Sequence, residues 1–176
     1  MNTDSDASDR PPAESNSPPA LKAKTSVRGE FLGRVAAVIL RWALGLSLLS
    51  AVADRFGLWG QPGSANVSWG DWAHFVAYTA KVNSFLPGVV APALAVTATA
   101  AEVSLGVALL LGVLPRLVAC TSAGLLALFA GAMTLSFGIK APLNYSVFVD
   151  LAAAFALGAW PATANRSQRG HKPPSA

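Results

Sequence analysis

Three charged residues lie inside long apolar runs of the sequence, namely Arg41, Glu102 and Asp150. An ionisable group inside a bilayer costs about 3 kcal/mol on insertion scales, so it points to a function by default. Glu102 falls near the middle of its run, beyond the reach of snorkelling to the membrane surface. A carboxyl group kept partly protonated by burial could exchange a proton with a bound quinol or a transported ion. Glu102 and Asp150 are therefore candidate proton-exchanging carboxylates, with Arg41 as their electrostatic partner.

The same residues also allow a purely structural interpretation. Arg41 would neutralise Glu102 or Asp150, and the pair would fix how the helices pack. One positive and two negative charges cannot all pair one to one. The remaining carboxylate would be neutral, or would pair with Lys140 or Arg55. The sequence leaves both interpretations open.

A second group of polar residues flanks the apolar runs. Two of them directly follow the first run, and three lie just before or at the start of the last one. We expect all five at the outer surface of the membrane, where they would form a rim network rather than a catalytic site. The members of this network are Asp54, Arg55, Lys140, Asn144 and Tyr145.

The elements that must position these residues are transmembrane helices. The chain is 53% hydrophobic and only 12% charged, which is too little charge for a soluble surface. Lipid offers the backbone no hydrogen-bond partners, so apolar runs of about 20 residues predict helices. We predict an all-α fold, a four-helix transmembrane bundle within a membrane domain at 33–160. Its helices would cover 33–54, 88–114, 116–139 and 142–160.

The segment between the first two predicted helices carries its own helical pattern. Ser68 followed by Asp71 resembles a capping box, and apolar residues then recur at spacings of three and four. We predict an interfacial amphipathic helix at about 69–86. Its aromatic residues would either fix the depth of the helix in the membrane or form the wall of a pocket that this helix covers. These aromatic residues are Trp69, Trp72 and Tyr78.

The distribution of lysine and arginine predicts the orientation in the membrane. The polar composition of residues 1–32 predicts a disordered cytoplasmic tail, and that of residues 161–176 predicts a basic cytoplasmic tail. The two ends of the chain and the turn at Arg116 hold nine basic residues, whereas the opposite side holds three. Because basic residues favour the cytoplasmic side, both termini should be cytoplasmic. We expect a multi-pass protein of the bacterial inner (plasma) membrane.

Composition excludes several classes of site. The single cysteine, Cys120, rules out disulfide frameworks and zinc ribbons, and we expect it to be a small core residue. No metal-ligand cluster, phosphate loop or nucleophile constellation is present in the sequence. The net charge of +4 comes from residues that flank apolar segments. We therefore expect the lipid bilayer, and not nucleic acid, to be the surroundings of this chain.

Several segments agree in order and spacing with a known family. They are LSAVADRFGLWG at 49–60, VSWGDWAHFVAYT at 67–79, TAAEVSLGVALLLGVLPR at 99–116 and AMTLSFGIKAPLNYSVF at 132–148. Through these segments the chain resembles the DoxX family of bacterial four-helix membrane proteins over about 33–160. The spacing from Glu102 through Gly106 to Arg116 is typical of the family at large.

The resemblance implies a role in a membrane redox complex. It suggests a quinone-interacting subunit or anchor, with a peripheral oxidoreductase subunit as the partner. The thiol–disulfide chemistry of a related branch does not fit a single cysteine. Two alternatives stay open, which are a small proton-coupled transporter using Glu102 and Asp150, and a non-catalytic anchor for peripheral partners.

Overall fold

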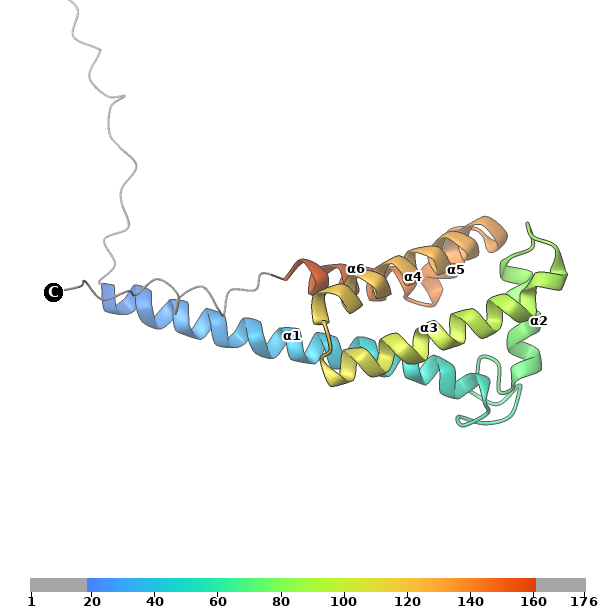
Figure 1. The fold of residues 1–176 in the computed structure, drawn as a ribbon, viewed down its shortest axis with the longest axis horizontal. Coiled ribbons are helices and arrows are strands. Elements are labelled where there is room, and N and C mark those ends of the chain that lie inside the picture. Colours follow the sequence, from blue (N-terminus) through green and yellow to red (C-terminus); the bar gives the residue numbers. More distant parts are fainter. Residues whose placement is uncertain (1–18, 161–176) are drawn as a thin grey trace, which may run out of the picture. The chain divides into compact units, whose positions relative to one another are not determined.

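The computed structural model of the chain describes residues 19–160, and their regular elements are helices throughout (Figure 1). The chain divides into two units, 1–34 and 35–176. Residues 19–34 of the first unit form the beginning of α1. The elements are α1 (Pro19–Arg55), α2 (Trp72–Val82), a 3₁₀ turn (Gly88–Val90), α3 (Ala91–Leu111), α4 (Pro115–Phe137), α5 (Lys140–Asn144) and α6 (Val147–Ala159).

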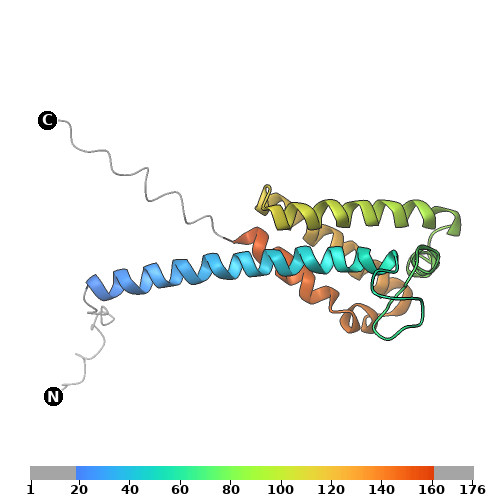
Figure 2. The same cartoon turned by 90° about the horizontal axis from the view of Figure 1, so that it is seen from below.

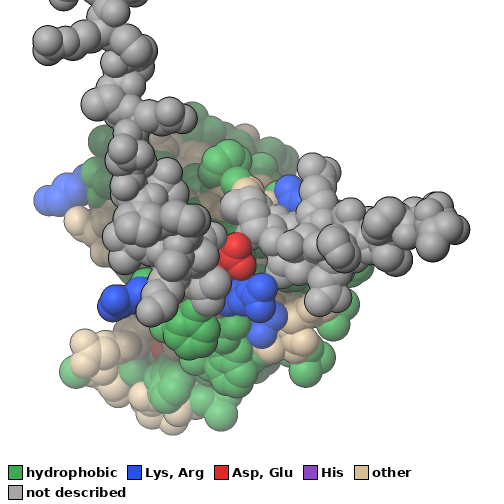
Figure 3. Space-filling model, turned by 90° about the vertical axis from the view of Figure 1, so that its left-hand side faces the viewer, with side chains coloured by type: hydrophobic (Ala, Val, Ile, Leu, Met, Phe, Trp, Pro, Cys, Tyr) green, Lys and Arg blue, Asp and Glu red, His purple; other side chains and the backbone are tan. Residues whose placement is uncertain are grey.

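Three stretches of helix are long and apolar enough to cross a membrane: Arg28–Arg55, Gly88–Leu111 and Pro115–Phe137. Many large apolar side chains on them are exposed, among them Leu46, Val96 and Leu128. Such a surface suits lipid rather than water. In Figure 3, green hydrophobic side chains cover much of the visible described surface, and Lys and Arg side chains interrupt it. The prediction of a membrane protein is thereby confirmed.

The second unit has a core to which four helices contribute. Within residues 35–160, α3, α4 and α6 run in alternating directions, and α6 ends near the turn that joins α3 to α4 (Figures 1 and 2). The helix α4 packs closely along α6. The buried apolar core comprises Leu44 and Leu48 of α1, Leu109 of α3, Val118, Ala119, Ala123 and Leu126 of α4, and Ala154 and Leu157 of α6.

The ends of several helices differ from the predicted ones. The first helix begins at Pro19, inside the segment predicted to be a tail, because proline suits the first helical position and good helix formers follow it. The predicted last helix, 142–160, is two elements, α5 and α6. Ser146 separates them with a φ of 56°, a left-handed conformation that no α-helix continues. The thirteen residues of α6 reach about 20 Å, less than the roughly 30 Å of bilayer hydrocarbon.

The segment predicted to be an interfacial helix at about 69–86 forms a shorter helix. The helix α2 covers Trp72–Val82, and its N-cap is Asp71 rather than Ser68. The φ of Gly70 is 71°, so the backbone cannot be helical before Asp71. The buried residues of α2 are Phe75, Thr79 and Val82, which lie on one face at spacings of four and three.

Glycines set the closest approaches between helices. Gly45 of α1 and Gly106 of α3 face each other, and a Cβ on Gly106 would lie 2.8 Å from Cγ of Leu49. Small residues of this kind let helix backbones pack closely in lipid. At Gly158 of α6, an added Cβ would lie 2.7 Å from Sγ of Cys120. Cys120 as a whole is exposed, so the prediction of a core cysteine was wrong.

The contact between α1 and α3 predicts the effect of one methyl group. Gly106→Ala should lower the free energy of unfolding by about 1–3 kcal/mol, because Leu49 must move to make room. The matched control is Gly124→Ala, where an added Cβ meets nothing within 4 Å. Unfolding in mixed micelles, followed by circular dichroism, measures both variants. Equal stabilities of the two variants would contradict the close crossing.

Candidate functional site

The centre of the site is an ion pair between Arg55 of α1 and Glu102 of α3. Nη2 of Arg55 donates to both carboxylate oxygens of Glu102, at 2.7 Å to Oε1 and 2.6 Å to Oε2. Nη1 of Arg55 donates to Oγ1 of Thr99 at 2.7 Å, and this hydroxyl donates onward to the carbonyl oxygen of Ala95. Glu102 is 1% exposed and Arg55 is 3% exposed. Both oxygens of the buried carboxylate are therefore occupied by one guanidinium.

Aromatic rings enclose the guanidinium from the side of α2. Its central carbon lies 3.8 Å from the ring centre of Phe75 and 5.4 Å from that of Trp69. The negative face of an aromatic ring attracts a cation, and more strongly where water is excluded. Arg55 thus connects three elements, since it ends α1, binds α3 through Thr99 and Glu102, and packs under Phe75 of α2.

The neighbouring Asp54 holds the connection that leads to α2. Its Oδ2 accepts hydrogen bonds from the backbone N–H groups of Ser68 at 2.9 Å and Trp69 at 3.0 Å. Asp54 is buried, and its carboxylate satisfies two backbone donors that would otherwise lack a partner there. Two consecutive residues at the end of α1 therefore bind different elements. Arg55 binds α3, and Asp54 binds the loop before α2.

The start of α2 has a cap of its own. Oδ1 of Asp71 accepts a hydrogen bond from the backbone N–H of His74 at 2.8 Å and lies 2.9 Å from Nδ1 of the same residue. These hydrogen bonds from His74 lower the pKa of the half-exposed Asp71 below its ordinary value. Asp71 therefore keeps its negative charge at the N-terminus of the helix, where the helix dipole favours it.

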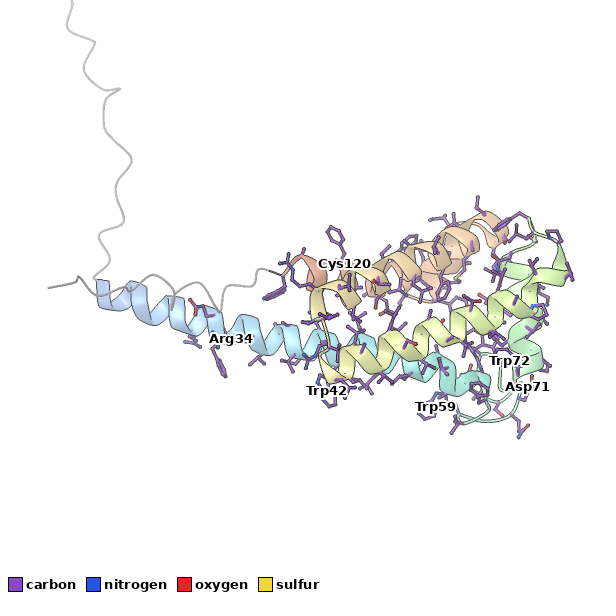
Figure 4. The ribbon with its side chains drawn as sticks, viewed as in Figure 1. Arg34, Trp42, Trp59, Asp71, Trp72 and Cys120 are labelled. Atoms are coloured by element: carbon purple, nitrogen blue, oxygen red, sulfur yellow. The ribbon has the colours of Figure 1, made fainter. Side chains whose placement is uncertain are left out.

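A group of aromatic rings, the aromatic cluster, extends from this site along α2. Trp69 lies 5.2 Å from Phe75 and 5.7 Å from Tyr78, measured between ring centres. Trp72 stacks on Phe56, and Tyr78 packs on Phe137 of α4. Burial, with a smaller contribution from Tyr145, raises the pKa of Tyr78 to about 12, so its phenol remains protonated at neutral pH. Figure 4 shows Trp59, Asp71 and Trp72 together at one end of the unit.

The predicted pairing of Arg41 with the buried carboxylates was wrong. Arg41 belongs to the same helix as Arg55, but its guanidinium lies against Gly112, the residue that ends α3. Arg55 reaches Thr99 and Glu102, which lie about 12–16 Å along α3 from its start at Ala91. The first turns of α3 therefore extend past the end of α1, and this offset places Glu102 beside Arg55.

Asp150 occupies a different place in the fold. Its Oδ2 accepts a hydrogen bond of 3.3 Å from Oγ of Ser47, which lies on α1. Among the hydrogen bonds of the described residues, none joins Asp150 to Glu102 or to Arg41. The two candidate carboxylates thus have separate partners and form no continuous relay within residues 28–160.

The predicted rim network is also not assembled. Asp54 and Arg55 are buried and turn to the loop and to α3, as described above. Lys140, Asn144 and Tyr145 are exposed on and after α5. The side-chain hydrogen bonds of Asp54 and Arg55 go to Thr99, Glu102 and the loop backbone, so they do not reach these three residues. The burial of Asp54 and Arg55 takes two of the five members away from the surface.

An open-sided cavity of about 480 Å³ lies between α4 and α6. Its lining is apolar except for Thr134, whose hydroxyl donates to the carbonyl oxygen of Ala130. Neither Glu102 nor Arg55 contributes to it. The cavity, called here the α4/α6 groove, is lined by Ala127, Ala130, Gly131, Thr134, Leu135, Phe148 and Leu151.

Thr99 and Phe75 are site residues whose roles the sequence did not predict. Thr99 precedes Glu102 by three residues, which places both on one helix face, and Phe75 belongs to the apolar stripe of α2. Helical spacing could have indicated that Thr99 lies beside Glu102. No spacing rule connects Thr99 or Phe75 to Arg55, which belongs to another helix. In the described part of the chain, no group of His, Cys, Asp and Glu could hold a metal ion.

Comparison of the sequence with family models finds no match, and comparisons with curated proteins and with solved structures find none either. The fold and the site define a helical membrane protein. Its site is the buried ion pair of Arg55 and Glu102, which Phe75 of α2 covers.

The ion pair predicts strong coupling between two substitutions. Arg55→Met or Glu102→Met alone should lower the free energy of unfolding by about 3–5 kcal/mol, because each leaves a buried charge without its partner. The double variant should be far more stable than the sum of the single effects implies. Unfolding in mixed micelles measures the coupling.

The control uses the other arginine of α1. Arg41→Met combined with Glu102→Met should give additive effects, because Arg41 lies against Gly112. Coupling of Glu102 to Arg41 instead of Arg55 would contradict the assigned pair.

Proposed function

We propose that the chain is a multi-pass inner-membrane protein of the DoxX type, with α1, α3, α4 and α5–α6 as a four-helix bundle and α2 in the outer interface. Three helices of membrane length and a core shared by four helices support this proposal. The segments that resemble the family include Asp54, Arg55, Thr99 and Glu102, which are the polar residues of the site. Family resemblance and site geometry therefore concern the same residues.

The proposed orientation has both termini in the cytoplasm. Arg116 lies at the turn between α3 and α4, at the end of the unit where α6 also ends. Lys81 is in the last turn of α2, and Lys140 begins α5. The basic tail residues add to the side of Arg116, and this bias favours that side as the cytoplasmic one.

Within this class, we propose the role of membrane anchor in a redox complex, with a peripheral oxidoreductase as the partner. The observation that carries this choice is the occupied carboxylate of Glu102, whose two oxygens both bind Arg55. A carboxylate held in this way stabilises the contact of α1 with α3 and α2, and it offers no free oxygen to a substrate. Its role is to hold the outer end of the protein together.

A complementation experiment tests this role. In a deletion strain whose respiratory activity is restored by the wild-type chain, the double variant Arg55→Met and Glu102→Met should restore it equally wherever the variant accumulates in the membrane like the wild-type chain. Apolar replacement keeps the packing, which is what an anchor requires. Gly124→Ala serves as the control for expression of an altered chain. A double variant that accumulates normally and fails to complement would contradict the anchor role and favour chemistry at Glu102.

Quinone binding is a second candidate function, and the α4/α6 groove favours it. The groove is apolar and open-sided, so a quinone would lie in it with one face against α4 and α6 and the other toward lipid. The site would then lie away from Glu102, in contrast to the pocket expected from the sequence.

A quinone titration in lipid nanodiscs tests the second candidate. Gly131→Leu should fill the groove and weaken saturable binding at least about tenfold, whereas Gly124→Leu, on the same helix outside the lining, should bind like the wild type. Absence of saturable binding to the folded wild-type protein would exclude this function. Equal loss in both variants would show that the groove is not the site.

A further inference from the structure

We propose that the seam between α1 and α6 at Asp150 is the docking site for a transmembrane helix of a partner protein that carries a lysine or arginine. This inference rests on the proposed role as an anchor and names the chemistry of one partner. It concerns a surface separate from the ion pair of Arg55 and Glu102.

The first observation is the position of Asp150 among the charges of the fold. Asp150 is only partly buried, and the hydrogen bond that it accepts from Ser47 is 3.3 Å long. The salt bridges of the described residues are those of Arg55 with Glu102 and His74 with Asp71. Both arginines of this part of α1 are placed elsewhere, Arg55 at Glu102 and Arg41 at Gly112. Asp150 therefore has no cationic partner within residues 28–160.

The second observation is the shape of the adjacent surface of α1. Ala43, Ser47 and Ser50 are all exposed, at spacings of four and three along one face of the helix. Small side chains at such positions allow another helix to approach until the backbones are close. Ser47 belongs to this face and also binds Asp150, so a helix lying on the face would meet the carboxylate.

Charge complementarity identifies the occupant. Ionisable residues inside a membrane pair with one another where they persist, because lipid does not solvate an isolated charge. A lysine or arginine on the incoming helix would supply the missing counter-charge, and Ser47 would remain as a second hydrogen-bonding group. Ser47 lies eight residues before Arg55, so the cation should sit about 12 Å inward from the end of α1.

The test uses synthetic transmembrane helices and the full chain in lipid nanodiscs. One labelled polyleucine peptide carries a single lysine at the depth of Ser47, a second carries leucine there, and a third carries the lysine two turns further inward. The first peptide should bind the wild-type chain at least about tenfold more tightly than the other two. Fluorescence anisotropy measures the three affinities.

Variants of the chain locate the binding. Asp150→Asn should reduce the affinity for the first peptide to that of the leucine peptide, and Ala43→Ile should weaken it by blocking the close approach while retaining the carboxylate. Thr97→Val, on the exposed face of α3, is the matched control and should bind normally, since its hydroxyl bonds only to its own helix at Ala93. Circular dichroism verifies that each variant is folded.

Three results would overturn the proposal. They are equal binding of the lysine and leucine peptides, retained binding by folded Asp150→Asn, and pairing of two copies of this chain through Asp150 that excludes the peptide. None of these results affects the complementation experiment, because the double variant at Arg55 and Glu102 leaves Asp150 unchanged. Failure of the docking site and failure of the anchor role are therefore distinguishable.

Discussion

The constraint on which the rest of this structure depends is the poor solvation of charge inside a membrane protein. Arg55 and Glu102 are both almost fully buried, so each must be neutralised and hydrogen-bonded by protein groups. A guanidinium meets this need because it donates several hydrogen bonds in one plane, here to Glu102 and Thr99. Phe75 covers the face of the guanidinium, which brings α2 into the same arrangement.

The connection between α1 and α3 follows from this pair. The ion pair joins the end of α1 to the middle of α3, Asp54 fixes the loop that leads to α2, and the glycine contact at Gly45 and Gly106 lets the two backbones approach. The ion pair and the glycine contact both depend on the axial offset between α1 and α3. A shift of one turn along α3, about 5 Å, would separate Arg55 from Glu102. The geometry therefore selects one register of the two helices.

Composition and periodicity were sufficient to predict helices and a membrane protein, because long apolar runs have few other solutions in lipid. They also identified Glu102 as a residue that needs an explanation. The sequence offered Arg41, Arg55 and Lys140 as partners of the buried carboxylates but could not select Arg55 for Glu102, since spacing along one helix gives its face but not its register against another helix. Arg41 and Arg55 lie on the same helix, and the axial offset between α1 and α3 decides which of them meets Glu102. Ser146 likewise broke the last helix through a local left-handed conformation for which the apolar pattern gives no signal.

The most direct measurement of the central pair is a solid-state NMR distance between labelled arginine nitrogen and labelled glutamate carboxyl carbon in lipid. Replacing Glu14 and Glu30 by glutamine leaves Glu102 as the single glutamate. The account predicts strong dipolar dephasing from a contact with N–O distances of 2.6 and 2.7 Å, retained in Arg41→Lys and lost in Arg55→Lys. Dephasing that disappears with Arg41→Lys instead, or that is absent from the folded wild-type chain, would contradict the account.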